Sequence, residues 1–200
     1  MKILAIGDIH GDTSLAKKAA KKAEKENVDL VLLTGDLTFF DQPAKDIIKP
    51  FEDRGKDVLI LPGNHEANST INSFADTYSR TKNLHGTHFE KNNIGFFGAG
   101  YSTDAGPFWI EDKEIMPLLK KGHKGIKHLD KKILVTHMHP KGSKSEFSGF
   151  KGSKGITEAI EKFKPDLAIF SHIHEARGTE DQMGKTKLIN VCRKPRIFEI

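Results

Sequence analysis

Short aliphatic runs recur along the first third of the chain and are separated by segments with helical patterning. The runs at 2–7 (KILAIG), 28–34 (VDLVLLT) and 57–61 (DVLIL) are largely apolar, which is typical of strands buried on both faces. The segments at 14–26 and 43–54 carry apolar residues near helical spacing, and we expect them to be helices. Because strands and helices alternate, this βαβαβ part predicts parallel strands joined by right-handed crossovers.

The rest of the chain predicts further strands and helices, without an internal repeat. The expected elements are a helix at 68–79, strands and tight turns near 95–100, buried strands at 132–136 and 167–171, a helix at 156–163, and a closing hairpin or strand pair at 187–191 and 196–200. The segment 140–155 is rich in Gly, Ser and Lys and predicts a long mobile loop. We expect this loop, with loops at 39–46 and 100–117, to shape any binding pocket.

Composition favours one globular unit. With 200 residues and 36% hydrophobic content, the chain can bury one substantial core, so we expect a single domain over residues 1–200. There is no apolar stretch long enough to span a bilayer, and the N-terminal MKILAIGDIHG becomes polar too soon for a signal peptide. We therefore expect a soluble, cytoplasmic protein without a membrane partner.

Charge and cysteine content bear on the possible ligands. The 32 Lys and Arg residues exceed the 27 Asp and Glu residues, giving a formal charge of +5 that favours anionic partners such as phosphate esters, nucleotides or nucleic acid. Cys192 is the only cysteine, and we interpret it as a small buried hydrophobe. Any metal ion must therefore be held by His, Asp, Glu or Asn.

Polar residues follow the carboxyl ends of the predicted strands. In chain order they are Asp8 and His10, then Asp36, then Asn64, His65 and Glu66, then His137 and His139, and finally His172 and His174. Because strand ends in an open α/β sheet lie along one edge, we expect these side chains to converge. In an extended chain residues i and i+2 project to the same side, which pairs each Asp or His with the His two positions later. This spacing does not choose between His137 and His139.

Each of these residues has a structural interpretation when taken alone. Asp8 could cap a helix, and Asp36 and the Gly-Asn pair at 63–64 could form turns. His172 and His174 could be polar residues of an edge strand. Glu66 could equally fix a turn, cap the following helix or support a ligand by a hydrogen bond. The remaining histidines match no motif and are interpreted as surface residues; they are His85, His88, His123 and His128.

Together, these residues favour a metal site with more than one ion. Imidazole, carboxylate and carboxamide donors without thiolate suit Mn, Fe, Zn, Ni or Co. The donors exceed the needs of one ion, and a carboxylate such as Asp36 can bridge two cations about 3.5–4 Å apart. Two such ions could generate a bridging hydroxide that attacks a phosphate ester in line. His65, next to Asn64, is suited to protonate the leaving oxygen or to stabilise its charge.

The ordered motifs DIH at 8–10, GD at 35–36, GNHE at 63–66, His137 and SHIH at 171–174 resemble those of the calcineurin-like metallophosphoesterase family. The resemblance extends over almost the whole chain. It implies an α/β fold in which a two-sheet β-sandwich is flanked by helices, in four αββα layers with a largely parallel N-terminal half. It also implies one metal held by Asp8, His10, Asp36 and His174, and a second held by Asp36, Asn64, His137 and His172. His65 would be the acid beside the leaving group.

Two departures from the family pattern narrow the expected substrate. Ser171 stands where the family usually has glycine before its last His-x-His. Asp36 is followed by Leu-Thr-Phe-Phe at 37–40, so the arginine that clamps phosphate in Ser/Thr protein phosphatases is missing. Protein dephosphorylation is therefore disfavoured, and the chain most resembles the small, cap-poor phosphoesterases, several of which act on phosphodiesters.

The sequence thus predicts a dinuclear metal-dependent phosphoesterase that hydrolyses phosphodiesters. One alternative is a phosphomonoesterase that acts on small phosphorylated substrates. A second is a nuclease or nucleic-acid-binding protein, which the lysine clusters favour, although Trp109, Tyr78 and Tyr101 form no evident stacking platform. A third is a scaffold without catalysis, which would predict eroded metal ligands, whereas every expected ligand is present.

Overall fold

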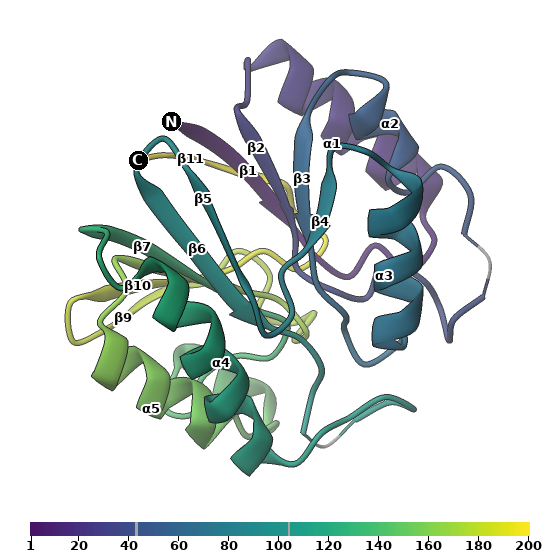
Figure 1. The fold of residues 1–200 in the computed structure, drawn as a ribbon. Helices are drawn as coiled ribbons and strands as arrows, with labels where there is room; N and C mark the ends of the chain where they lie inside the picture. Colours follow the sequence, from purple (N-terminus) through teal and green to yellow (C-terminus); the bar gives the residue numbers. More distant parts are fainter. Residues whose placement is uncertain (43, 104) are drawn as a thin grey trace.

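Two β-sheets pack face to face and are covered by helices on their outer sides (Figure 1). The computed structural model describes residues 1–42, 44–103 and 105–200. This arrangement is the predicted four-layer αββα sandwich, so the predicted fold class is confirmed. Among the described residues, no helix combines the length and apolar character needed to cross a bilayer.

The first sheet has the strand order β11-β1-β2-β3-β4. Its strands are β1 (Lys2–Ile6), β2 (Leu30–Leu33), β3 (Asp57–Ile60), β4 (Thr81–Asn83) and β11 (Arg196–Glu199). Strands β1 to β4 are parallel, and β11 pairs with β1 in the antiparallel sense. The helices that connect the parallel strands are α1 (Thr13–Lys25), α2 (Lys49–Glu52) and α3 (Asn68–Thr77).

The second sheet has the strand order β5-β6-β7-β8-β10-β9. Its strands are β5 (His88–Lys91), β6 (Ile94–Ala99), β7 (Lys131–Thr136), β8 (Leu167–Phe170), β9 (Glu180–Met183) and β10 (Thr186–Asn190). The four inner strands are parallel, and β5 and β9 are antiparallel edges. The helices of this half are α4 (Asp112–Ile126), the 3-10 helix η1 (Lys144–Ser148) and α5 (Lys154–Phe163).

Three apolar layers explain why the inner strands have little polar patterning. In β1, Ile3 and Ala5 face the second sheet, whereas Leu4 and Ile6 face the outer helices. Both faces are therefore withdrawn from water, which requires a continuous apolar run rather than an alternating one. Helix α1 covers the outer face with four buried alanines, and the Asp12 side chain caps the helix by accepting the Leu15 N–H.

The predicted helix at 43–54 is shorter in the structure. Pro43 lies outside the described residues, residues 45–48 form turns and bends, and α2 spans only Lys49–Glu52. Asp46 has a φ of +59°, and Pro50 has no N–H to donate to the carbonyl of residue 46. Both features prevent the helix from extending towards its predicted start.

Helix α4 was not predicted, because the sequence suggested a loop at 100–117. Its buried face is formed by Ile115, Leu119, Gly122 and Ile126, at spacings of three and four residues. The segment 140–155 also contains regular structure, since it includes η1 and the first two residues of α5. The Glu146 carboxylate accepts the N–H groups of Gly142 and Gly152 and thereby holds this segment together.

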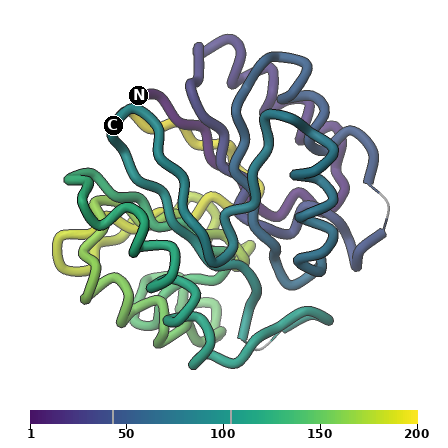
Figure 2. Tube along the Cα trace, viewed as in Figure 1, coloured from purple at the N-terminus to yellow at the C-terminus, as the bar shows by residue number. Residues whose placement is uncertain are grey.

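The predicted closing hairpin is wrong. Strand β10 pairs with β8 and β9 in the second sheet, whereas β11 pairs with β1 in the first. The chain changes sheets at Cys192, which bridges to Gly7, and at Arg193, which has a φ of +48°. The C-terminal end consequently lies beside the N-terminal end (Figure 2), where the Met1 ammonium group donates to the Ile200 carbonyl at 2.7 Å.

Candidate metal centre

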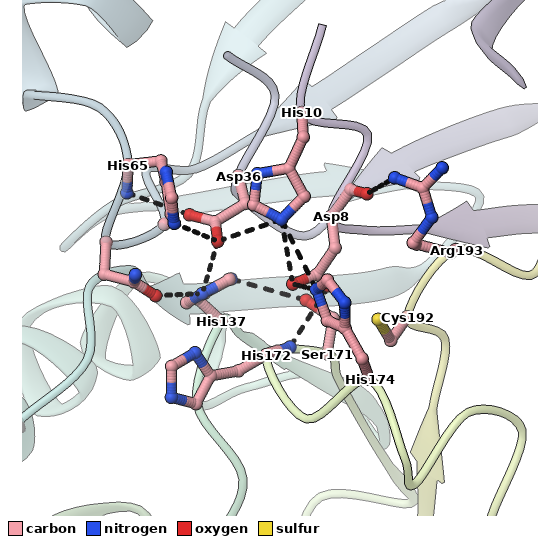
Figure 3. A network of polar contacts seen from close by, with 12 residues as sticks. Asp8, His10, Asp36, His65, His137, Ser171, His172, His174, Cys192 and Arg193 are labelled. Carbon is pink, nitrogen blue, oxygen red and sulfur yellow. Dashed lines mark hydrogen bonds and ion pairs between the residues drawn. The ribbon is translucent and has the colours of Figure 1, made fainter. Parts of the chain in front are cut away.

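Loops from both sheets meet where their parallel strands end (Figure 3). The first sheet contributes Asp8 and His10 after β1, Asp36 after β2, and Asn64 with His65 after β3. The second sheet contributes His137 after β7, and His172 with His174 after β8. All eight predicted site residues therefore lie at one edge of the sandwich, as expected for strand ends in an α/β sheet.

Left-handed backbone conformations place several of these residues. Asp8, His10, Asp36 and His172 have φ values of 56°, 48°, 52° and 69°. The chain is therefore not extended at these positions. The prediction that residues i and i+2 project to the same side assumed an extended strand, and that assumption is wrong here. Hydrogen bonds between loops hold these conformations instead. The N–H of Asp8 donates to the Gly35 carbonyl at 3.0 Å, and the N–H of His10 donates to the Asp36 carbonyl at 2.8 Å.

One group of donors is formed by Asp8, His10 and His174. Asp8 Oδ1 lies 3.4 Å from His174 Nε2 and 4.0 Å from His10 Nε2. The two Nε2 atoms of His10 and His174 are 3.4 Å apart. Asp8 Oδ1 is buried and has no hydrogen-bond partner among the described residues. A buried carboxylate oxygen without a partner is costly, so this group fits a cation placed among its three side chains.

Asp36 lies at the centre of the remaining contacts. Its Oδ2 is 3.6 Å from His10 Nε2, 3.6 Å from His137 Nε2 and 3.9 Å from His65 Nε2. Its Oδ1 accepts the backbone N–H of His65 at 2.9 Å. One carboxylate thus faces imidazoles from both sheets, which is the arrangement needed for a bridging ligand.

His137 and Asn64 give the sharpest test of whether these residues fit a metal. His137 Nδ1 is 2.9 Å from the Thr34 carbonyl oxygen, so Nδ1 carries the proton and donates it. Nε2 therefore presents a lone pair to Asn64 Oδ1, only 2.9 Å away. Two acceptor atoms at this distance repel each other unless a second proton on the imidazole or a metal ion lies within reach of both. The residues fit a divalent ion, and the Thr34 carbonyl would orient the imidazole ligand.

The pKa shifts of the clustered side chains also favour metal binding. Burial lowers the pKa of His10 to about 4 and that of His172 to about 3, so both imidazoles are neutral near pH 7 and free to bind a metal. Burial and the charge of Asp8 raise the pKa of Asp36 well above its ordinary value. Burial also opposes ionisation of Asp8, but the nearby imidazoles of His174, His137 and His172 hold the pKa of Asp8 below the usual range.

His172 and His139 differ in their relation to the centre. The His172 ring is 5.0 Å from that of His137, and its backbone N–H donates to Asp8 Oδ2 at 3.1 Å. Its side chain is outside the three closest ligand groups that the described residues form. His139 is buried and its Nε2 lies 3.3 Å from the Phe150 carbonyl oxygen. Of the pair left open by spacing, His137 is therefore the one that contacts the cluster.

Glu66 forms hydrogen bonds with the two loops that carry Asp36 and Asn64. Its carboxylate accepts the N–H of Gly63 at 2.8 Å and the N–H groups of Leu37 and Thr38 at 3.3 Å. The side chain therefore joins the loop that carries Asp36 to the loop that carries Asn64. Burial and the charge of Asp36 raise the pKa of Glu66 to about 7.

Sequence reasoning missed the contacts of Arg193 and the role of Thr34. Arg193 donates to the Asp8 carbonyl and to the Asp12 carboxylate, both at 3.1 Å, and thereby braces the loop after β1. No motif marked Arg193, because it follows an unpredicted change of sheet. The Ser171 hydroxyl donates to the Thr34 carbonyl at 3.0 Å, so a serine is accommodated at the position where the resemblance implies glycine.

His85 is not the surface residue that the sequence suggested. Its Nδ1 accepts the N–H of Gly100 at 2.9 Å, and its ring packs against Tyr101 with the ring centroids 5.1 Å apart. The turn at 84–86 places this side chain under the loop that follows β6. Burial lowers the pKa of His85 to about 4.

Comparisons with known proteins connect this geometry to a family. Residues 1–176 match the family model described as calcineurin-like phosphoesterase. A UPF0046 protein of Caenorhabditis elegans is 29% identical over 102 residues, which cover 50% of this chain and 33% of that protein. The matched region therefore spans about a third of the relative's length.

Solved structures share the fold over almost the whole chain. The crystal structure of TT1561 of Thermus thermophilus has a TM-score of 0.76 at 16% identity, with coverage of 98% of this chain and 97% of that chain. A dimetal phosphatase from Danio rerio has a TM-score of 0.62 at 12% identity, with coverage of 95% and 86%. At these identities the likeness concerns the fold alone.

Proposed function

The chain belongs to the calcineurin-like phosphoesterase family, and on that premise we propose that it is a dinuclear metal-dependent phosphodiesterase. The observation that carries the proposal is the convergence of lone-pair donors on Asp36 from both sheets, with Asn64 Oδ1 and His137 Nε2 facing each other at 2.9 Å. Asp36 belongs to two groups of possible ligands, one with Asp8 and His137 and one with His10 and His65.

The expected ligands divide between the two ions. One ion would be held by Asp8, His10, Asp36 and His174, and the other by Asp36, Asn64, His137 and His172. The donor set fits Mn, Fe, Zn, Ni or Co. When bound, such ions supply the positive charge that acidifies a water molecule and neutralises the oxygens of a phosphate ester.

His65 is the proposed donor to the leaving oxygen. Its side chain is 15% exposed, and its Nε2 lies 3.9 Å from Asp36 Oδ2. Its backbone N–H is held by Asp36 Oδ1, so the imidazole stays beside the centre. Burial lowers the pKa of His65, which favours a neutral ring that donates from one nitrogen. Such a ring can donate a hydrogen bond to the leaving oxygen and stabilise the negative charge that develops there.

The preference for diesters follows from the side chains beside the ligands. A phosphomonoester carries a second negative charge that is usually met by arginine or lysine. Here the loop after Asp36 presents Phe39 and Phe40 instead, and Arg193 is already bound to Asp12 and to the Asp8 carbonyl. An anion with one negative charge and two organic groups fits these surroundings better.

The proposal can be tested with bis-p-nitrophenyl phosphate and p-nitrophenyl phosphate, assayed side by side. Metal-stripped protein would be resupplied with Mn, Ni, Zn or Mg, with Asp36→Asn as the inactive control. We expect diester turnover that returns with metal and is absent from the variant. A preference for the monoester would indicate a phosphatase. Absence of turnover from protein with two bound metals would indicate a non-catalytic scaffold.

A further inference from the structure

Two phenylalanines are exposed next to the metal centre. Phe39 and Phe40 follow Asp36 by three and four residues, and their exposed fractions are 46% and 49%. Burying an aromatic side chain stabilises a fold relative to exposing it. An exposed pair therefore forgoes this stabilisation, and its position at the site calls for a functional explanation.

The rings of this pair pack on the proposed donor to the leaving group. The Phe39 ring is stacked on the His65 ring, with centroids 5.2 Å apart and an interplanar angle of 28°. The Phe40 ring lies 4.5 Å from His65 at 33°, and 4.4 Å from Phe39 at 60°. Phe39 also meets the His10 ring edge-on at 6.0 Å. The four rings form a continuous aromatic surface that begins at the expected metal ligands.

The backbone keeps this surface in place at a cost. Phe40 and Asp41 have φ values of 52° and 55°, and a left-handed conformation is strained for a bulky residue such as phenylalanine. Hydrogen bonds hold the strained turn: the Asp41 N–H donates to the His65 carbonyl at 2.8 Å, and the Ala67 N–H donates to the Asp41 carboxylate at 3.2 Å. The turn that carries the two rings is therefore tied to the segment that carries His65.

The position of the surface limits what it can contact. A group bonded to the leaving oxygen must lie beside His65, and so it must lie against Phe39 and Phe40. Open ring faces favour a planar aromatic group, because stacking needs only one flat surface. An acyl chain needs an enclosed apolar cavity. The cavity of about 170 Å³ beside the centre has a mixed lining of Ala105, Phe150, His172, Ile173, His174 and Glu175, and neither Phe39 nor Phe40 lines it.

We propose that Phe39 and Phe40 are specificity-determining residues that stack the nucleobase of a nucleotide phosphodiester. This inference rests on the proposed function and adds the substrate class to it. The nucleobase could belong to a small nucleotide or to a nucleic-acid strand, since both present the same aromatic face next to a phosphodiester. From the sequence, Trp109, Tyr78 and Tyr101 form no evident stacking platform. In this proposal Phe39 and Phe40 provide the stacking surface instead.

The test compares two diesters of equal charge, adenylyl-adenosine and glycerophosphoglycerol, in the metal-loaded enzyme. Leucine keeps an apolar side chain but cannot stack, so the variants are Phe39→Leu, Phe40→Leu and their combination. We expect the double variant to lower kcat/KM for the dinucleotide by about tenfold or more, mainly through KM. Because the two rings also pack on His65, a loss common to both diesters reports on His65. The stacking role is measured by an about tenfold fall in the ratio of kcat/KM for the dinucleotide to that for the glycerol diester. Phe198→Leu is the control, at a half-buried phenylalanine of β11 that pairs with Ile3 at the opposite end of β1 from the site.

A binding measurement separates this inference from the proposed function. Calorimetry on metal-loaded protein would compare AMP with inorganic phosphate, and the double variant should weaken AMP binding while leaving phosphate binding unchanged. If the wild-type protein hydrolyses neither diester, the proposed function fails and AMP binding still decides the stacking role. Equal effects on both diesters and on both ligands would overturn the stacking role.

Two further binding comparisons identify the kind of molecule that carries the nucleobase. An advantage of AMP over inorganic phosphate of about tenfold that disappears in the double variant indicates a small nucleotide. If the double variant loses binding only to a single-stranded oligonucleotide, the nucleobase belongs to a nucleic-acid strand. Either result supports the stacking role of Phe39 and Phe40. Binding to phosphatidylglycerol vesicles that is lost in the double variant, with no effect on AMP or the oligonucleotide, would instead make the pair a lipid contact and overturn it.

Discussion

His65 is the residue through which the proposed chemistry is most directly tested. Its imidazole contacts Asp36 but is not among the expected ligands of either metal. We therefore expect His65→Ala to retain both metals and to slow turnover by about 10² or more, the usual scale for a lost proton donor. Metal content by elemental analysis and kcat for bis-p-nitrophenyl phosphate check the two parts. Loss of a metal from this variant would make His65 a ligand.

A second prediction at the residue scale concerns pH and His85. The pKa of His85 falls from an ordinary value of 6.5 to about 4 because the ring is buried against Tyr101. Below pH 6.5 the unfolded chain therefore takes up a proton that the folded chain refuses. Stability should fall as the pH drops from 6.5 to 4, with an upper limit of about 3 kcal/mol from this group.

Substitution isolates this contribution of His85. His85→Gln cannot titrate, so its unfolding free energy should depend less on pH between 4 and 6.5 than that of the wild type. Urea unfolding at several pH values measures the slope. His128→Gln is the control, since His128 is exposed and pairs with Glu90 at 3.7 Å. An unchanged slope in His85→Gln would show that the ring is protonated in the folded state.

The candidate residues could be predicted from the sequence, but the way they are held could not. Motif order and strand ends were sufficient to name Asp8, Asp36 and His137, because parallel strands end at one edge. The positive φ angles of Asp8 and Asp36 depend on hydrogen bonds between loops that are distant in sequence. The burial of His85 depends in the same way on a loop that follows another strand. Local patterns carry no information about such contacts.

At the scale of elements, Glu66 links two loops that must keep a fixed distance. Glu66→Ala removes the acceptor for buried N–H groups of Gly63, Leu37 and Thr38, and each lost hydrogen bond of this kind costs about 1–3 kcal/mol. We expect a lower Tm and a loss of metal affinity of roughly 10- to 100-fold, the range for residues that orient ligands. Thermal unfolding and metal titration measure the two effects.

Matched variants distinguish a positioning role for Glu66 from general destabilisation. Glu66→Gln keeps one acceptor oxygen and should recover part of both losses. Glu158→Ala, on the exposed face of α5, should change neither. If Glu66→Ala lowers the Tm but binds metal as the wild type does, Glu66 supports only the fold.

Elements with strong periodicity were predicted well, and those set by the tertiary structure were not. Strands β1 and β2 and helix α1 lie within two residues of their expected bounds, since their patterns are continuous. Helix α4 was missed because Pro117 and its lysines obscure an apolar face that becomes clear only against the second sheet. The separation of β10 from β11 is likewise a consequence of sheet pairing, because either strand alone is compatible with a hairpin.

At the scale of the whole molecule, the centre spans the junction between the two sheets. The first sheet supplies Asp8, His10, Asp36 and Asn64, and the second supplies His137, His172 and His174. Any ion held by both sets adds a link between the halves of the sandwich. These donor residues could be predicted from the sequence. The surface around them could not, because it depends on loops such as the turn at Phe39 and Phe40, and no local sequence pattern predicts the strained conformation of that turn.

This division of ligands leads to a prediction about stability. Metal at about 100 times its Kd should stabilise the wild type by about 2.7 kcal/mol, which corresponds to a rise in Tm of roughly 5–10 °C. The raised pKa of Asp36 means that its ionised form is unfavourable without a cation. Metal-free Asp36→Asn should therefore unfold at a higher temperature than the metal-free wild type, and the order should reverse when metal is added. Calorimetric scans of both proteins, first with EDTA and then with Mn, measure which of the two has the higher Tm in each condition. An equal rise in Tm for the two proteins would place the stabilising metal away from Asp36, since only an ion bound by this carboxylate can reverse their order.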